Sequence, residues 1–168
     1  MAKRVGILEH RVVRMPDLRE AADIVGSKAL SRRAVPPTYI PMKNAIFYSL
    51  AAAFAEEKGS GAIIGGHNAD DRRQFADTSE EFFASLQKTL TAASPRLRGS
   101  GLKILRPLKD VRKAEVVTMA AKIGVPLELT WSCHRSGEEH CWSCDGCRRR
   151  REAFDAAGVR DPLAPKKV

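Results

Sequence analysis

The sequence predicts an α/β fold with a parallel β-sheet, followed by a metal-binding segment near the C-terminus. Short apolar segments typical of strands alternate with longer segments whose apolar residues recur at helical spacing. One short segment is an uninterrupted apolar run between glycines, the form expected of a strand that is buried on both faces. All four cysteines lie between Cys133 and Cys147, which points to a single metal site.

The first elements are predicted from local composition. We interpret His10–Met15 as a strand and the segment that Pro16 opens as a helix. The residues from Val25 to Pro41 are irregular and end in a proline-rich stretch that stays extended. A helix is predicted over Asn44–Gly59, with these apolar residues at helical spacing: Ile46, Phe47, Leu50 and Phe54.

The later elements repeat the alternation of strand and helix. Gly61–His67 is the buried strand, and Thr78-x-x-Glu81 forms a capping box for a helix. The residues that this helix is expected to place inward are Phe82, Phe83, Leu86 and Leu90. The remaining predicted elements are a strand over Lys103–Leu108, a helix over Asp110–Gly124 and a short closing helix over Arg151–Gly158.

Composition predicts one domain and narrows the choice of partner. The chain has 168 residues, 43% of them hydrophobic, and no apolar run approaches the ~20 residues of a membrane span. A net charge of +9 favours a polyanionic partner, either nucleic acid, a nucleotide or another phosphorylated ligand. No basic stretch is interleaved with aromatic residues, so single-strand recognition gains no support. We interpret Arg148–Arg151 as a solvated or substrate-facing surface rather than a nucleic-acid arm.

The cysteine spacing predicts a structural zinc ion. Cys133, Cys141, Cys144 and Cys147 follow the pattern Cys-x7-Cys-x2-Cys-x2-Cys, which can place four thiolates around one tetrahedral ion. An iron–sulfur cluster is the alternative, and His134 or His140 are alternative ligands. Two disulfides in so short a segment would cross-link little of the chain. Reduced thiols imply a reducing compartment, so we expect a cytoplasmic protein.

Polar residues after the predicted strands and at helix starts are the candidate ligand contacts. In open α/β sheets, ligands bind beyond the carboxyl ends of the strands. There, Asp70 and Asp71 are suited to Mg²⁺ or a nucleobase edge, or they form a simple polar turn. Lys43 and Asn44 begin a helix, where backbone N–H groups and a cation suit an anion. Lys113 is a candidate phosphate or carboxylate contact, or a solvated lysine.

Several segments together carry a resemblance to a known family. In order, they are TYIPMKN, GGHNADD, FADTSEEFF, PLKDVRKAEVV, TWSCHRSGEEHCWSCDGC and REAFDAAGVRDP. From about His10 to Pro162, the chain resembles the later part of the 7-cyano-7-deazaguanine synthase family, within the pyrophosphate-loop ATPase superfamily. The resemblance implies a Rossmann-like parallel sheet in a nucleotide-binding region over residues 1–130, with the zinc-binding loop and closing helix over 131–168.

The resemblance also implies an activity. Members are carbon–nitrogen ligases that use ATP, Mg²⁺ and ammonia to convert 7-carboxy-7-deazaguanine to the nitrile, a precursor of queuosine and archaeosine. The implied catalytic residues are Asp71 and Lys113, and the implied cofactor-binding residues are Lys43, Asn44, Asn68 and Asp77. The four cysteines become zinc ligands. His67, Asp70 and residues 72–74 depart from the bacterial form of the motif.

One family feature is missing from the sequence, and it leaves two functions open. The Ser-Gly-Gly-x-Asp-Ser loop that cradles pyrophosphate is absent, and the predicted strands correspond to the third, fourth and fifth in the order 3-2-1-4-5. We expect another polypeptide or a longer gene to supply the rest, rather than direct pairing of the remaining strands in a contracted sheet, with a homodimer or partner chain as the assembly. The alternative is a non-catalytic, zinc-stabilised module that binds a nucleobase or, less favoured, RNA.

Overall fold

The computed structural model describes residues 1–15, 40–72, 75–135 and 137–165. The chain divides into two compact units, one formed by Val13–Asp110 and the other by Met1–Val12 together with Val111–Val168. The helix that Pro16 was predicted to open lies outside the described residues. The single-domain organisation stays a prediction.

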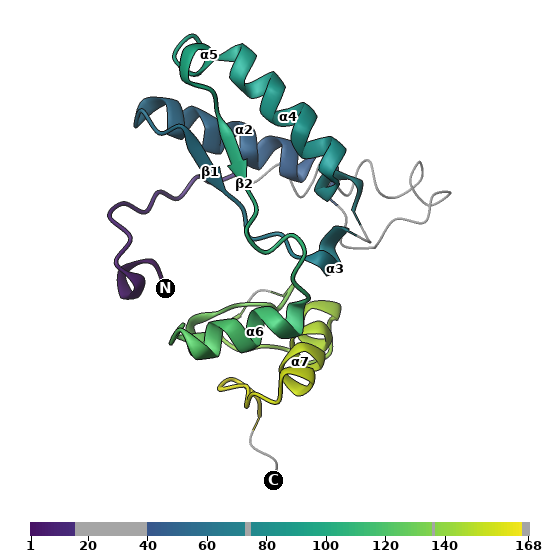
Figure 1. Ribbon diagram of the computed structural model, residues 1–168. Coiled ribbons are helices and arrows are strands. Elements are labelled where there is room, and N and C mark those ends of the chain that lie inside the picture. The colour runs from purple at the N-terminus through teal and green to yellow at the C-terminus, as the bar shows by residue number, and fades with distance from the viewer. Residues whose placement is uncertain (16–39, 73–74, 136, 166–168) are drawn as a thin grey trace. The chain divides into compact units, whose positions relative to one another are not determined.

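The unit Val13–Asp110 is built around two parallel strands, as the alternation of elements predicted. Its elements are α2 (Lys43–Glu57), β1 (Ala62–Ile64), α3 (Ala69–Arg72), η2 (Ala76–Thr78), α4 (Glu80–Ala93), α5 (Leu97–Ser100) and β2 (Lys103–Leu105). The strands pair in register with Ile63 opposite Ile104. Figure 1 shows α2 and α4 beside this small sheet.

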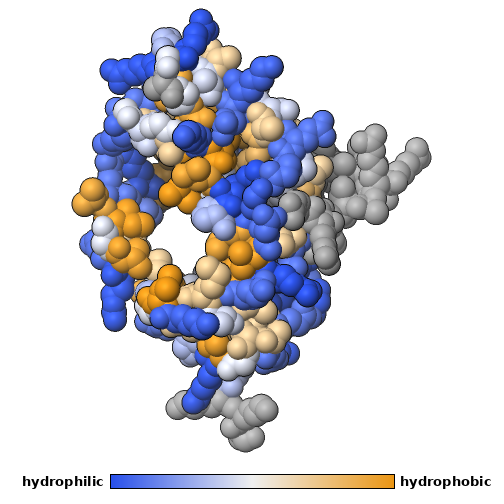
Figure 2. Space-filling view, viewed as in Figure 1, coloured by the Kyte–Doolittle hydropathy of each residue, from blue (hydrophilic) through white to orange (hydrophobic). Residues whose placement is uncertain are grey.

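The sheet buries one face only. Ile63 and Ile104 point into a core that they share with Tyr48, Phe83 and other apolar residues of the helices. Ile64 is 72% exposed, and Figure 2 shows hydrophobic residues on the visible face of the sheet. The prediction that the first of these strands is buried on both faces was therefore wrong. In the part of the chain that the structure describes, α2 and α4 cover only one of its faces.

Side chains of α4 complete the hydrogen bonding of β2. The N–H of Ile104 donates to Gln87 Oε1 at 2.7 Å, and the N–H of Leu102 donates to Thr91 Oγ1 at 3.3 Å. A short strand with one neighbour would otherwise leave these buried donors without acceptors. The helix therefore substitutes for a further strand along this edge.

The start of α4 differs by one residue from the prediction. Ser79 is the N-cap, and its Oγ accepts the N–H of Phe82 at 3.1 Å. Thr78, the predicted cap, is buried and donates instead to the carbonyl oxygen of Phe75 at 2.7 Å. The inward residues are as predicted: Phe83 is buried, and Phe82, Leu86 and Leu90 pack against the same core.

The predicted strand over His10–Met15 is not present. These residues have no regular secondary structure, and Val12 and Val13 are exposed. An extended segment becomes a strand only when a neighbouring strand accepts its hydrogen bonds, and the described residues offer it none.

The second unit packs α6 against α7. Its elements are η1 (Ala2–Val5), α6 (Lys113–Lys122), η3 (Leu127–Leu129) and α7 (Asp145–Ala157), and Val117, Ala153 and Phe154 form its core. The closing helix was predicted from Arg151, but α7 begins six residues earlier because Cys144 already serves as its N-cap. Among the described residues, no helix is long and apolar enough to cross a membrane.

A buried ion pair joins α7 to the segment that follows it. Arg150 Nε donates to Asp161 Oδ2 at 2.6 Å and Nη2 donates to Oδ1 at 2.8 Å. Arg150 also donates to Thr130 Oγ1 at 2.7 Å and lies over the ring of Phe154. Burial acts to raise the pKa of Asp161, but the hydrogen bonds from Arg150 and from the N–H of Leu163 outweigh it and lower that pKa.

We expect Gly65→Ala to destabilise the unit Val13–Asp110. A Cβ at Gly65 would lie 1.7 Å from Tyr48 Oη, which is enclosed in the core, so the helix or the strand end must shift. Overpacking of this kind costs about 1–3 kcal/mol of unfolding free energy. Urea unfolding followed by circular dichroism measures it. Gly66→Ala is the matched control, because a Cβ there meets nothing within 4 Å; equal losses for both variants would contradict the packing argument.

We expect Asp161→Asn to cost about 3–5 kcal/mol, because it leaves the buried guanidinium of Arg150 without its counter-charge. The folded-state pKa of Asp161 is lowered, so its contribution is present above the unfolded pKa of about 3.9 and is lost as pH falls through the folded value. Unfolding measured at pH 7 and below pH 4 tests both statements. Asp155→Asn, on the exposed side of α7, serves as the control, and a similar loss in both variants would refute the role of the pair.

Candidate functional site

The four cysteines form one compact group of sulfurs. Their Sγ atoms all lie within 4.8 Å of one another. Cys141 and Cys147 are 3.9 Å apart at sulfur, and Cys133 and Cys144 are 4.0 Å apart. A tetrahedral ion with metal–sulfur distances of about 2.3 Å separates its sulfurs by about 3.8 Å. The four thiols therefore fit one metal ion, and among the described residues they are the one group of at least three such ligands.

The backbone around the thiols stabilises negative charge on them. Backbone N–H groups donate to three of the four sulfurs. The sulfur of Cys133 accepts two of them, from Arg135 and Cys141. The sulfur of Cys144 accepts the N–H of His134, and the sulfur of Cys141 accepts the N–H of Cys144. The hydroxyl and N–H of Ser143 are the main causes that lower the pKa of Cys141 to about 5. Burial raises the pKa of Cys147 to about 12, so its thiolate needs a cation beside it.

The two histidines near the thiols have other roles. His140 is buried between Trp131 and Trp142, with ring centroids at 4.4 and 5.5 Å. Its Nε2 accepts the N–H of Ser132 at 3.0 Å, so this nitrogen is not available to a metal. His134 lies against Gly146, where a Cβ would come within 2.1 Å of the Ser132 carbonyl oxygen. Among the described residues, the four thiols are therefore the group that could hold a metal, and Nε2 of His140 is not part of it.

A second candidate site lies at the carboxyl end of β1, in the unit Val13–Asp110. Asn68 Oδ1 accepts the N–H groups of Asp70 and Asp71 at 2.9 and 3.3 Å. In return, Asp71 Oδ2 accepts the N–H of Asn68 at 3.0 Å. This reciprocal pair caps the short helix α3. Among the described residues, the other carboxylate oxygen of Asp71 has no hydrogen-bond donor.

The predicted anion-binding helix start is held by Asp77. Its Oδ2 accepts the N–H of Asn44 at 3.3 Å, and its backbone carbonyl accepts Asn44 Nδ2 at 3.1 Å. Lys43 is the first residue of α2, and its ammonium lies 5.9 Å from the ring of Phe75. Asn44 is buried, so it anchors η2 to α2, and the cation of Lys43 is the more accessible group at this helix start.

His67 lies where these side chains converge. Its ring stacks on Tyr48 at 5.9 Å and tilts against Phe83 at 5.3 Å. Burial lowers the pKa of His67, against the opposing effect of Asp71 and Asp77. All the charges that act on this imidazole come from elements packed around it, namely Asp71, Asp77, Lys43 and Arg106. Three of the predicted residues, Lys43, Asp71 and Asp77, thus act electrostatically on a histidine to which the sequence argument assigned no role.

Arg106 is a second residue that the sequence argument missed. It directly follows β2, and His67 lies three residues after β1, so the rule that strand ends carry function could have identified both. Its guanidinium lies 4.4 Å from the Phe83 ring and holds Glu80 at 2.6 Å, which lowers the pKa of Glu80 to about 2. Arg106 Nε and Tyr48 Oη are buried without a hydrogen-bond partner among the described residues.

Lys113, the remaining predicted site residue, belongs to the other unit. It is the first residue of α6, and it follows Arg112, whose N–H donates to Glu115 Oε2 at 2.7 Å. Its predicted catalytic role stays a prediction.

The arginine run was interpreted as a solvated or substrate-facing surface, which is wrong for Arg150. Arg150 is 3% exposed and pairs with Asp161. The other three also have partners on or near α7: Arg148 binds Asp145 and Glu152, Arg149 binds Asp145, and Arg151 donates to the Trp142 carbonyl oxygen. All four arginines therefore have partners within this unit.

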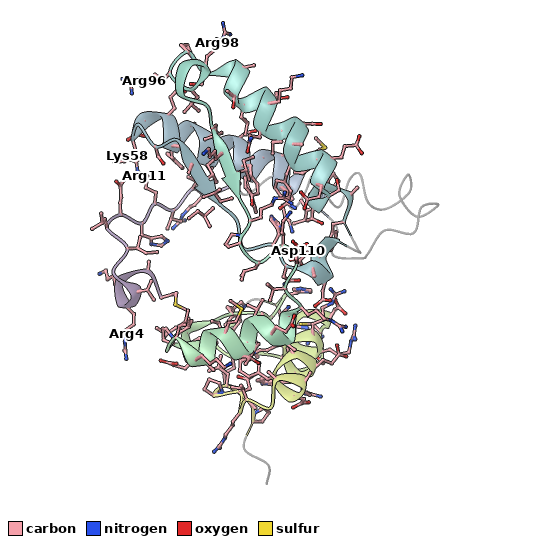
Figure 3. All side chains as sticks on the ribbon, in the orientation of Figure 1. Arg4, Arg11, Lys58, Arg96, Arg98 and Asp110 are labelled. Atoms are coloured by element: carbon pink, nitrogen blue, oxygen red, sulfur yellow. The ribbon has the colours of Figure 1, made fainter. Side chains whose placement is uncertain are left out.

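Some basic residues of the unit Val13–Asp110 lie away from the strand ends. Figure 3 shows Lys58, Arg96 and Arg98 at the end of the unit opposite to Asp110. Arg96 and Arg98 donate to the backbone carbonyls of Glu56 and Ala92 at 3.2 and 2.9 Å. These cations therefore neutralise helix C-termini rather than face the candidate site.

The described residues thus define an α/β protein with charged groups after its two parallel strands and with four cysteines that could hold one metal ion. The family model for "Queuosine biosynthesis protein QueC" matches residues 1–158. The chain belongs to this family.

Named relatives agree with the family. The chain is 42% identical over 133 residues to 7-cyano-7-deazaguanine synthase of Thermoplasma acidophilum, covering 79% of this chain and 56% of the relative. It is 39% identical to the Sulfurovum sp. protein of the same name, covering 79% and 59%. The Trichodesmium erythraeum protein is 33% identical over 175 residues, covering 97% and 78%. The chain thus spans little more than half the length of the first two relatives.

We expect Cys144→Ser to lower the metal content of the purified chain below one ion, because an alcohol is a far weaker ligand than a thiolate. His134→Ala is the matched control in the same loop and should keep one ion per chain. Elemental analysis by mass spectrometry measures both. Loss of metal in His134→Ala but not in Cys144→Ser would reverse the ligand assignment.

Proposed function

We propose that this chain takes part in the ATP-dependent conversion of 7-carboxy-7-deazaguanine and ammonia to 7-cyano-7-deazaguanine, a carbon–nitrogen ligase reaction of queuosine precursor synthesis. The observation that supports it most is the set of hydrogen bonds that fixes Asp71 to Asn68 after β1 and Asp77 to Asn44 at the start of α2, next to Lys43. Membership of the QueC family over residues 1–158 supports queuosine precursor synthesis as the pathway in which such a site would act. The fold proposed with it is the Rossmann-like sheet of the pyrophosphate-loop ATPases.

The proposed chemistry assigns roles to the side chains at the strand ends. A carboxylate is a poor electrophile, so the substrate must first be adenylated. Lys43, at the N-terminus of α2, would offset phosphate charge, and Lys113 is proposed to do the same. The oxygens of Asp71 and Asp77 without protein donors would accept hydrogen bonds from the amino-pyrimidinone edge of the base. The backbone N–H groups of Asn68 and Asn44 would hold these two carboxylates in place.

The metal proposed for the four cysteines is zinc, with a structural role. Zinc accepts four thiolates in a closed tetrahedral site and has no redox chemistry. In the described residues no group of three carboxylate or histidine ligands accompanies the strand ends. We therefore propose that Mg²⁺ enters with ATP, since it commonly binds phosphates and water with few protein ligands.

The pyrophosphate of ATP also needs a loop of backbone N–H groups. The 168 residues contain no Ser-Gly-Gly-x-Asp-Ser sequence. We propose that a polypeptide segment outside these residues supplies that loop, from a partner chain or from the same gene, in a cytoplasmic assembly that is dimeric or heteromeric.

The experiment is a turnover assay with the zinc-loaded chain. It is supplied with 7-carboxy-7-deazaguanine, ATP, Mg²⁺ and ammonia, alone and together with the N-terminal segment of the Thermoplasma acidophilum relative. We expect 7-cyano-7-deazaguanine and AMP by mass spectrometry in the supplemented reaction. Asp71→Asn should lower kcat/KM by about 10²-fold, because it removes a charge-assisted hydrogen bond to the base.

The control variant for this assay is Asp155→Asn on α7, which should turn over like the parent chain. Absence of nitrile with the parent chain in every condition would refute the proposed function. Salt-sensitive RNA binding by a chain that makes no nitrile would favour the non-catalytic alternative.

A further inference from the structure

We propose that His67 is the catalytic base that removes protons from nitrogen in the proposed reaction. This inference rests on the proposed function and adds to it a residue and a chemical step. It begins from the position of the imidazole, three residues beyond the end of β1, where the flanking elements place their charged groups.

The aromatic neighbours fix the plane of the ring. Tyr48 lies against one side with an interplanar angle of 25°, and Phe83 contacts the ring at a tilt of 49°. Tyr48 is itself held because Gly65 leaves room for its hydroxyl beside the strand end. A base is effective only when its nitrogen is aimed, and this packing restricts the imidazole to few orientations.

The ring nitrogens are available to a ligand. Among the described residues, no side chain or backbone group makes a hydrogen bond to the imidazole of His67, and the residue is only partly buried. This contrasts with His140, whose Nε2 is occupied by a backbone N–H. A histidine with a purely structural role is commonly satisfied by such a partner.

The surroundings keep the imidazole in its basic form. The groups that face it are Lys43 and Tyr48 from α2, Asp71 from α3, Asp77 from η2 and Arg106 after β2. Burial is the largest effect and lowers the pKa of His67, so the ring is neutral at pH 7. Once protonated, it would be stabilised by the two carboxylates nearby.

The proposed reaction requires such a base twice. In the first step ammonia attacks the acyl adenylate, a carbon–nitrogen bond forms, the carbon–oxygen bond to AMP breaks, and the nitrogen loses a proton to His67. In the second step the adenylated amide loses AMP as the carbon–nitrogen triple bond forms, and the remaining N–H proton passes to His67. The protonated ring returns each proton to water.

The test isolates the second step. The reconstituted system is supplied with the amide, 7-carboxamido-7-deazaguanine, and ATP, so that no ammonia is present and its own protonation cannot shape the pH profile. His67→Phe keeps an aromatic ring in the stack and removes both nitrogens. We expect kcat to fall by about 10²–10⁴-fold with little change in the dissociation constant of the amide measured by calorimetry.

Two further readouts separate catalysis from packing. The parent chain should lose kcat/KM with decreasing pH as His67 becomes protonated, and His67→Phe should lack this acid limb. Added imidazole should restore part of the activity of His67→Ala. His10→Ala and His10→Phe are the matched controls, because His10 is an exposed histidine of the other unit.

The outcomes are distinct. If the parent chain makes nitrile and His67→Phe matches it, His67 is not the base and this inference fails while the proposed function stands. A loss of activity in His67→Phe without imidazole rescue of His67→Ala and with an unchanged acid limb would also overturn it. If the parent chain makes nitrile from neither the carboxylate nor the amide, the proposed function fails and the inference falls with it.

Discussion

The close approach of Tyr48 to Gly65 is the constraint on which the strand-end site depends. A hydroxyl occupies the space that any side chain at Gly65 would need, so α2 can lie directly against the end of β1. That contact places the Tyr48 ring beside His67 and Phe83, and through Phe83 it brings Arg106 into the same cluster. The helix that begins with Lys43 and the strand that leads to Asn68 and Asp71 are therefore joined by packing before any ligand binds.

Local capping then determines which polar groups stay available. Asn68 and Asp71 cap α3 reciprocally, and Asp77 is tied to the start of α2 through Asn44. One oxygen of each carboxylate accepts a structural hydrogen bond, and the other has no protein donor within the described part of the chain. Residues with a structural partner are held in fixed positions, which lowers the cost of orienting them for a ligand. A structural role for these aspartates in a polar turn is therefore compatible with a role in binding a ligand.

Sequence predicted the elements that depend on local pattern and missed features that depend on distant packing. The parallel direction of the strands, the inward face of α4 and the four-thiol group followed from periodicity and spacing, and the pairing of β1 with β2 followed from the strand order that the family resemblance implied. The exposure of Ile64 did not, because burial of a strand depends on what covers each face. Arg150 was equally hidden: in a run of four arginines, only the fold decides which one turns inward to meet Asp161. The positions of His67 and Arg106 after predicted strands could have marked them as candidates, but no sequence pattern showed which residues they would contact.

The cysteine group and the site around His67 differ in how partly buried charge is stabilised. At the thiols, backbone N–H groups and the hydroxyl of Ser143 favour thiolate at Cys141, but burial disfavours it at Cys147, where a bound cation would favour the thiolate. Around His67, burial is the largest effect on the pKa and favours the neutral ring, while carboxylates and cations nearby act on it in opposite directions. A centre that a bound cation would stabilise suits a permanent structural metal. A centre of opposing charges with an unoccupied neutral base suits chemistry in which charge appears and is discharged within each turnover, which is the demand that adenylation and loss of AMP would make.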